Sequence, residues 1–491
     1  MVDKSIEFTN IIKQLKSKVN NCSDIKTIEM KIGKDYISCL VVYIEITVSG
    51  STTNASAVTK ILSNLSYLSP GQIYEVLDSN HAGMVDVTYY TDIDTAIDGL
   101  LTGDVLVLID GYSKIIKVPD KGYPSLGVKE TDAEKVIRGS NEGFSDSIKQ
   151  NTALIRRRIR SSDLKSEELT IGIRSKTGVA IMYMQEIVSP GLIKMIKKRL
   201  NQYLIDSVQD TGVLEQLAEK QWYSPFPEFQ TTTRPDRAAM AVMEGRAVVL
   251  SDNSPSALIL PVDINSFLRT TDDYYNRFQS ATFARLIRYM AAFFACTMPG
   301  LYLAVTNFHT QILPTSLLLS FWENRIGVPF PEVVEIVLME IAFELLREAG
   351  IRLPGAMGNA IGIVGGLIIG QAAVDANIVS PIVVIVVAFT ALCSFAIPNE
   401  EFAFAFRIIK FYIIALSSWL GFFGFLVGIY TILIHLSKLK SFGIPYLMPF
   451  VGAELNDYKD ERDSIFRLPL RLLNRRPIYS RYNQRIKLKN K

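Results

Sequence analysis

Three long stretches without charge constrain what this chain can fold into. Residues 289–322 and 411–434 contain no Asp, Glu, Lys or Arg, and residues 353–399 contain only Asp375. A helix needs roughly 20 consecutive apolar residues to cross a bilayer, and each stretch is long enough to supply them. The sequence therefore excludes a purely soluble protein and predicts a membrane domain in the second half of the 491-residue chain.

We predict four membrane spans, at residues 287–307, 357–375, 378–398 and 411–435. The region between the first two is more polar, since residues 323–354 carry six Glu and three Arg. Such charges are too costly for a span that faces lipid, so we interpret 308–354 as re-entrant or interfacial. One alternative stays open: residues 331–349 could cross inside a bundle that shields them from lipid.

The C-terminal end indicates the orientation. Residues 464–491 hold nine Lys or Arg and no acidic residue, and basic segments next to spans stay on the cytoplasmic side. Four spans then place both termini there. The whole chain has a net charge of only +3, which does not favour a nucleic-acid partner.

The first half of the chain reads as α/β. Residues 36–48 and 179–188 are apolar, rich in β-branched and aromatic side chains and bounded by turn residues, as strands are. Residues 192–206 carry apolar side chains at helical spacing instead. The predicted fold class is therefore an α/β region followed by an all-α membrane domain.

The α/β region contains a candidate internal repeat. Shifting the sequence by 142 residues lays 96–119 onto 238–261 with six identical positions, and both segments read as helix, glycine stop, strand, turn and strand. Any unit of this type looks similar, but we favour a duplication. The expected division is subdomain 1 at 1–140, an Arg-rich helical linker at 141–164, subdomain 2 at 165–268, a membrane domain at 287–449 and a basic tail at 450–491.

Two groups of charged residues in the α/β region are candidate interface residues. The first is an arginine cluster on a predicted helix, consisting of Arg156, Arg157, Arg158 and Arg160. It could hold phosphate or lipid headgroups, but arginines that pair with acids of a neighbouring subdomain or subunit are commoner. The second is Arg234 with Asp236, where Asp236 is expected to cap the helix that follows.

A glycine ladder marks the span 358–375. Gly358, Gly362, Gly366 and Gly370 recur every four residues, which lets another helix approach closely. Opposite them lies a stripe formed by Val364, Ile368, Gln371 and Asp375. Around an axis of several copies the stripe could line a pore with an apolar constriction and a polar mouth. The alternative is an ordinary bundle helix, with Gln371 hydrogen-bonded and Asp375 ending the helix.

Five further polar residues could line an ion path. Asn307, His309 and Gln311 lie near Pro314 at the end of the first span, and Glu340 and Glu344 share one face of the acidic segment. Polar groups at broken helices can form such paths. A histidine satisfied at the membrane interface and a solvated helix face are the simpler explanations.

Signatures of catalysis are missing from the sequence. It contains no phosphate-binding loop, no G-x-S-x-G, no H-E-x-x-H and no paired cysteines, and its four cysteines lie far apart. We therefore predict no enzyme activity, no metal and no cofactor. A sensor, a channel or a scaffold remains.

Many segments together resemble the A subunits of spore germinant receptors, the GerA-type spore germination proteins of endospore-forming bacteria. The similar segments are Glu134–Gly139, Asn151–Ile159, Arg234–Asp236, Pro299–Tyr302, 345–354, 363–381 and 441–449. Two positions depart from the family pattern, which has an acid where this chain has Thr233 and a Glu where it has Gln311. The first departure puts a local ion pair in doubt, and the second weakens a carboxylate at that position as an ion ligand.

The resemblance implies a multi-span subunit of the spore inner membrane. It would assemble with a transporter-like B subunit, which binds the nutrient, and with a lipoprotein C subunit. It would also form a homo-oligomer that passes monovalent cations and starts germination. Two alternatives are a non-conducting scaffold of the same receptor and a related late-sporulation accessory channel component.

Overall fold

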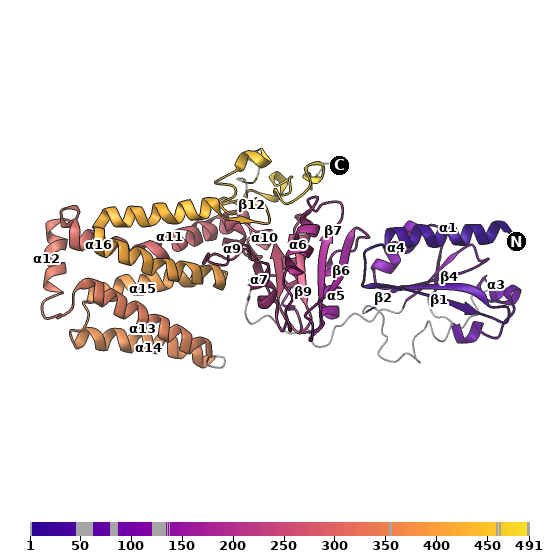
Figure 1. Ribbon diagram of the computed structural model, residues 1–491, viewed down its shortest axis with the longest axis horizontal. Coiled ribbons are helices and arrows are strands. Elements are labelled where there is room, and N and C mark those ends of the chain that lie inside the picture. The colour runs from indigo at the N-terminus through magenta and orange to yellow at the C-terminus, as the bar shows by residue number, and fades with distance from the viewer. Residues whose placement is uncertain are drawn as a thin grey trace. The chain divides into compact units, whose positions relative to one another are not determined.

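The computed structural model divides into two compact units (Figure 1). It describes residues 2–45, 62–78, 87–119, 134, 136, 138–352, 356–457, 460 and 463–488, and the side chains of these except 2–7, 356–364 and 367. The α/β unit comprises 1–220, 229–262 and 470–491, and the helical unit comprises 221–228 and 263–469. The chain therefore passes from one unit to the other four times.

The α/β unit contains two five-stranded antiparallel sheets with the same strand order. The first is β1-β2-β4-β5-β3 and the second is β6-β7-β9-β10-β8. The first sheet's strands are β1 (Ile25–Ile32), β2 (Ile37–Ile44), β3 (Thr88–Tyr90), β4 (Val105–Ile109) and β5 (Ile115–Val118), and its helices are α1 (Val2–Lys18), α3 (Pro70–Asp78) and α4 (Ile93–Leu101). The second sheet's strands are β6 (Leu164–Ile171), β7 (Thr177–Met184), β8 (Gln230–Thr232), β9 (Ala247–Ser251) and β10 (Ala257–Leu260), and its helices are α5 (Ile148–Arg158), α6 (Leu192–Leu200), α7 (Thr211–Ala218) and α8 (Pro235–Met243).

The repeat expected from the sequence is present in the fold. The bounds of α4, β4, β5 and β3 differ from those of α8, β9, β10 and β8 by 142 residues, which is the shift found by self-comparison. Burial explains the apolar runs in these strands, because helices cover both faces of the first sheet. Ile73 of α3 packs with Val41 and Val107, whereas Leu15 of α1 packs with Leu40 on the other face.

The predicted linker 141–164 belongs to the second subdomain. Its helix α5 contributes Ile148, Leu154 and Ile155 to the same core as Val242 of α8 and Val248 of β9. The sequence pattern showed the helix but could not show that its apolar face belongs to a neighbouring sheet. The α/β region thus consists of two packed subdomains without a free helical linker.

The helical unit is a bundle preceded by two short helices. Its helices are α9 (Ile264–Leu268), α10 (Asp272–Tyr275), α11 (Phe278–Phe308), η1 (Thr310–Ile312), α12 (Thr315–Glu323), α13 (Glu332–Arg352), α14 (Ala356–Asp375), α15 (Pro381–Phe395) and α16 (Glu400–Lys438). The strands β11 (Lys440–Ser441) and β12 (Ile444–Pro445) and the short helix η2 (Ala453–Asn456) follow. Among the described residues, α11 and α16 are long and apolar enough to cross a membrane.

Helix α16 reverses direction at Gly421. This glycine has φ 61° and ψ −139°, which is outside helical geometry. The hydroxyls of Tyr412 and Thr431, 19 residues apart, lie 3.1 Å from each other, whereas a straight helix would separate these residues by about 28 Å. The single span predicted at 411–435 is therefore wrong. The sequence did not reveal the turn because neither a charge nor a proline interrupts the apolar run.

The basic C-terminal tail is divided between the two units. Residues 450–469 belong to the helical unit, and the last residues pack on the second subdomain. There Ser480 forms an antiparallel bridge with Val188, and the backbone N–H of Arg481 donates to the carbonyl of Ile187 at 2.8 Å. The short helices of this segment are η4 (Leu470–Leu472) and η5 (Tyr482–Gln484). The tail predicted as a separate segment at 450–491 is thus part of both folded units.

Candidate functional site

The described part of α14 has two different faces. Gly370 is buried, and a Cβ atom placed on it would lie 3.3 Å from Val384 Cγ1 of α15, while one on Gly366 would lie 3.7 Å from Phe343 of α13. Ile368, by contrast, is 59% exposed. Gly370 therefore lies in close contact with α15, whereas a methyl group would fit at Gly366, and packing through the whole glycine ladder stays a prediction.

The candidate pore stripe lies on the exposed face of α14. Ile368, Gln371 and Asp375 are all exposed, and the Gln371 amide donates to the Asp375 carboxylate at 3.5 Å. Gln371 is thus not buried against a neighbouring helix of its own chain. The side chain of Val364 and the surroundings of Gly358 and Gly362 lie outside the described residues, so their roles stay predictions.

The acidic face of α13 is directed into the bundle. Glu340 is 2% exposed and pairs with Lys410 of α16, which is 4% exposed. Glu344 pairs with Arg407 of the same helix at 2.7 Å. This arrangement contradicts the solvated helix face considered for the two glutamates. It matches the alternative in which 331–349 runs inside a bundle, because charges in such an environment need partners.

A second ionic cluster lies at the beginning of α13. Arg325 pairs with Glu332 at 2.5 Å and with Glu335 at 3.4 Å. The other carboxylate oxygen of Glu335 accepts a 2.7 Å hydrogen bond from the backbone N–H of Ser380, at the start of α15. Glu335 therefore ties α13 to the N-terminus of a neighbouring helix, where a negative charge is favourable.

The structure separates the five polar path candidates into two groups. Asn307 and Gln311 are exposed at the end of α11, and the ring of His309 lies 3.3 Å from the carbonyl of Ala304. Glu332 bonds to Thr306 in this region, but Glu340 lies eight residues further along α13, about 12 Å away along the axis. Sequence reasoning missed Arg407 and Lys410, because no local pattern connects them to α13.

The arginine cluster of α5 is used mainly for internal contacts. Arg156 is fully buried and forms two hydrogen bonds with Asp24, from Nε at 2.8 Å and from Nη2 at 2.9 Å. Asp24 precedes the first sheet, so this pair joins the two subdomains. Arg157 and Arg158 both pair with Glu142, whereas Arg160 is exposed. Only Arg156 thus pairs with an acid of the neighbouring subdomain, because Glu142 belongs to the same subdomain as α5.

The two arginines also control the charge state of Glu142. Its partial burial raises the pKa, but hydrogen bonds from Arg157 and Arg158 outweigh this effect, so the pKa of Glu142 lies below its ordinary value. Stability from this contact is therefore present at neutral pH. It is lost only as the pH falls through the lowered pKa.

Arg234 and Asp236 form a buried pair at the start of α8. Arg234 Nη2 donates to Asp236 Oδ2 at 2.8 Å and to the carbonyl of Ser140 at 2.7 Å. The acidic partner of Arg234 is therefore Asp236, since Thr233 has no carboxylate to offer. The expectation that Asp236 precedes and caps a helix is wrong, because α8 begins at Pro235, and proline is favourable in a first helical turn.

Breaking the Arg156–Asp24 pair should strongly destabilise the α/β unit. Asp24→Asn removes the charge that compensates a fully buried guanidinium, at an expected cost of about 3–5 kcal/mol. Thermal unfolding of the full-length protein in detergent measures this cost. The control is Asp206→Asn, which breaks an exposed 3.7 Å pair with Arg174 and should change little. Equal melting of both variants would contradict a role for Asp24 in joining the subdomains.

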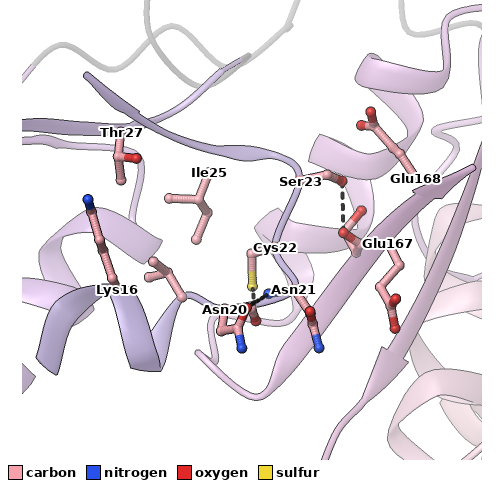
Figure 2. A pocket seen from close by; sticks show the side chains of 11 residues that line it. Lys16, Asn20, Asn21, Cys22, Ser23, Ile25, Thr27, Glu167 and Glu168 are labelled. Carbon is pink, nitrogen blue, oxygen red and sulfur yellow. Dashed lines mark hydrogen bonds between the residues drawn. The ribbon is translucent and has the colours of Figure 1, made fainter. Parts of the chain in front are cut away.

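A surface hollow of about 430 Å³ lies where the segment before β1 crosses the start of β6 (Figure 2). The backbone N–H of Ser23 donates to the carbonyl of Ser166 at 2.9 Å, which extends the second sheet by one short segment. Glu167 and Lys16 are among the lining residues. Burial raises the pKa of the Cys22 thiol at its edge, so this cysteine is a poor nucleophile.

The described residues contain no group of three or more His, Cys, Asp or Glu that could hold a metal ion. The four cysteines are buried and unpaired. The candidate functional features that the geometry does provide are the exposed stripe of α14 and the buried charges between α13 and α16.

Comparison with known proteins identifies the family of this chain. A family model described as Bacillus/Clostridium GerA spore germination protein matches residues 13–479. The chain belongs to this family. The family and the two long apolar helices together indicate that the protein associates with a membrane.

Several curated relatives match nearly the whole chain. Spore germination protein KA of Bacillus subtilis is 36% identical over 95% of this chain and 85% of its own length. Spore germination protein GerLA of Bacillus cereus is 32% identical over 96% of this chain and 94% of its own length. Among solved structures, the N-terminal domain of the A subunit of the Bacillus megaterium spore germinant receptor GerK3 is 26% identical, with a TM-score of 0.39, over 51% of this chain and 92% of that one.

Proposed function

We propose that this protein is the A subunit of a nutrient germinant receptor, that it oligomerises in the spore inner membrane, and that the oligomer passes monovalent cations when the nutrient binds. The observation that carries this proposal is the exposed stripe of α14. An amide and a carboxylate on the outer face of an apolar bundle are costly in lipid unless they face water or another protein surface. Copies arranged around an axis would satisfy both conditions.

The same arrangement supplies a gate. With Gly370 packed inward against α15, Ile368 points away from its own bundle. A ring of such isoleucines forms an apolar constriction that stays dry when narrow, and Gln371 and Asp375 form a polar mouth beside it. An acidic mouth attracts cations. Because Glu340 and Glu344 are paired with basic residues inside the bundle, we assign them a structural role and no role in conduction.

The helical unit supports a membrane domain with six passes in place of four. These would be α11, α13, α14, α15 and the two halves of α16, residues 400–420 and 422–438. Residues 309–331, which contain η1 and α12, join α11 to α13, and short connections join the later helices. An even number of passes keeps the beginning and the end of the helical unit on one side, which the basic C-terminal segment assigns to the cytoplasm.

The partners in this proposal are the B and C subunits of the receptor. The resemblance assigns nutrient binding to the transporter-like B subunit, and the α/β unit offers a surface for contacts between subunits. A non-conducting scaffold is the second candidate, favoured by the ion pairs of Glu340 with Lys410 and of Glu344 with Arg407 within a single bundle. The two candidates differ in whether reconstituted oligomers carry current.

Replacing Ile368 by Ala should make the oligomer leak cations. The smaller side chain widens the constriction and admits water, so potassium release from proteoliposomes and from dormant spores should rise without nutrient. The matched control is Ile385→Ala, since Ile385 is also an exposed isoleucine, 67% accessible, but lies on α15.

Ion retention and nutrient response equal to wild type in the Ile368→Ala spores would remove the pore assignment. Oligomers that carry no current under any nutrient condition would favour the scaffold. A monomer in detergent would remove the axial arrangement altogether.

A further inference from the structure

Residues 221–228 leave the α/β unit and fold with the helical unit. Phe226, at their centre, is 2% exposed. Its ring centroid lies 6.0 Å from that of Phe402, 5.8 Å from Phe406 and 6.1 Å from Tyr446. An aromatic side chain buried on so many sides anchors the segment firmly.

Hydrogen bonds fix the segment at both sides of this anchor. The Ser224 hydroxyl and His435 Nε2, near the end of α16, lie 2.8 Å apart. Further along, the Ser441 hydroxyl donates to the carbonyl of Glu228 at 2.8 Å. Residues 221–228 thus form a platform that is held by these contacts at the end of the second half of α16.

This platform presents two aromatic side chains outward. Trp222 is 81% exposed and Tyr223 is 65% exposed, with their rings edge to face at 6.1 Å. The Tyr223 ring also lies 6.4 Å from that of His435. Lys438 and Lys440, a few residues after His435, are exposed as well. Exposed aromatic rings beside lysines at the end of an apolar helix are typical of the layer where a bilayer meets water.

The other two tryptophans of the chain mark the opposite end of the bundle. Trp419 is 77% exposed and lies two residues before the turn at Gly421, and Trp322 of α12 is 63% exposed. The end of α11, which leads into α12, is at this turn, because Phe308 contacts Gly421. From Gly421 to His435 the helix rises about 21 Å. With side chains that extend beyond both ends, this length suits the hydrocarbon core of a bilayer, about 30 Å thick.

We propose that Trp222 and Tyr223 insert into the phospholipid headgroup layer on the side where α11 begins, so that a segment of the α/β half of the sequence anchors the bundle at a fixed depth. The inference rests on the proposed membrane insertion of the helical unit. It adds a lipid-binding surface that lies outside the helices themselves. The partner is the zwitterionic or anionic headgroup region, which accepts the indole N–H, the tyrosine hydroxyl and the lysine ammonium groups.

Fluorescence of single-tryptophan variants in vesicles tests this surface. In the full-length protein, Trp322→Phe with Trp419→Phe leaves only Trp222, and Trp222→Phe with Trp322→Phe leaves only Trp419. The aqueous control carries all three Trp→Phe changes together with Tyr67→Trp, since Tyr67 is 79% exposed in the first subdomain. Each variant is reconstituted in phosphatidylcholine vesicles with and without lipids brominated near the headgroup, and is titrated with iodide.

Trp222 should lose most of its emission to the brominated lipid and resist iodide, whereas the tryptophan at position 67 should do the opposite. Lipid quenching of Trp419 but not of Trp222 would overturn the anchor while leaving the membrane helices in place. If neither is quenched by lipid, both the anchor and the proposed membrane domain fail. Emission of Trp222 that is protected from iodide and from lipid alike would mean that protein covers it, which also overturns the proposal.

Discussion

Exchanging the charges of Glu340 and Lys410 should restore a protein that either single substitution destabilises. Glu340→Gln leaves the ammonium of Lys410 buried without its counter-charge, and Lys410→Met does the same to the carboxylate. Loss of one partner of a buried ion pair costs about 3–5 kcal/mol. The double exchange, Glu340→Lys with Lys410→Glu, keeps an opposite pair in the same place, although Glu344 and Arg407 nearby will prevent full recovery.

Thermal unfolding in detergent and cation retention by spores measure these effects. The matched control is Glu348→Gln, which removes the partner of Arg352 on the same helix. That pair has the ordinary spacing of four residues, with side chains 59% and 77% exposed, so its loss should change little. A charge exchange that melts no higher than either single variant would show that the pair does not hold α13 to α16.

Gly300→Ala should destabilise the bundle although alanine is the better helix former. Gly300 lies in α11, and a Cβ atom on it would come within 2.5 Å of Ile413 Cγ2 and 2.9 Å of Ser417 Oγ, both on α16. The two helices would have to move apart, and overpacking of this kind costs about 1–3 kcal/mol. Thermal unfolding of the full-length protein in detergent measures the loss.

Gly366→Ala is the matched control for this effect. It places the same methyl group on a helical glycine whose nearest neighbour would be 3.7 Å away, an ordinary contact. Its main consequence is a gain in helix propensity of roughly 0.5–1 kcal/mol. The two substitutions should therefore have opposite signs. Equal effects would mean that the close approach at Gly300 is not maintained in the membrane.

The repeat in the α/β unit was predictable because its signal is local. The helix, the glycine stop and the two strands of each copy follow one another within about 25 residues, and the shift of 142 residues reproduces the bounds of α4 and α8. Outward placement of Ile368 and Gln371 opposite the glycines likewise follows from helical periodicity alone.

The contacts that decide the helical unit are not local, and the sequence could not reveal them. Glu340 and Lys410 are 70 residues apart in the sequence. A hydropathy profile scores each of the two charges as unfavourable in a membrane, because the profile contains no information on the partner of a charge. For the same reason the arginines of α5 predicted acidic partners but did not identify Asp24. The close approach of α11 to α16 at Gly300 could not be predicted, because a single glycine forms no repeating pattern of the kind seen in α14.

The order of synthesis gives the last segment of the chain a particular role. Residues 470–491 complete the α/β unit, with Ser480 packed so closely on Gly245 that a Cβ there would lie 2.8 Å from its Cα. A ribosome adds these residues after every helix of the bundle has been made. The second subdomain therefore receives its last packed segment only after the entire membrane unit has been translated. A chain that stops before residue 470 would leave the surface around Val188 and Gly245 uncovered even though every helix of the bundle had been made.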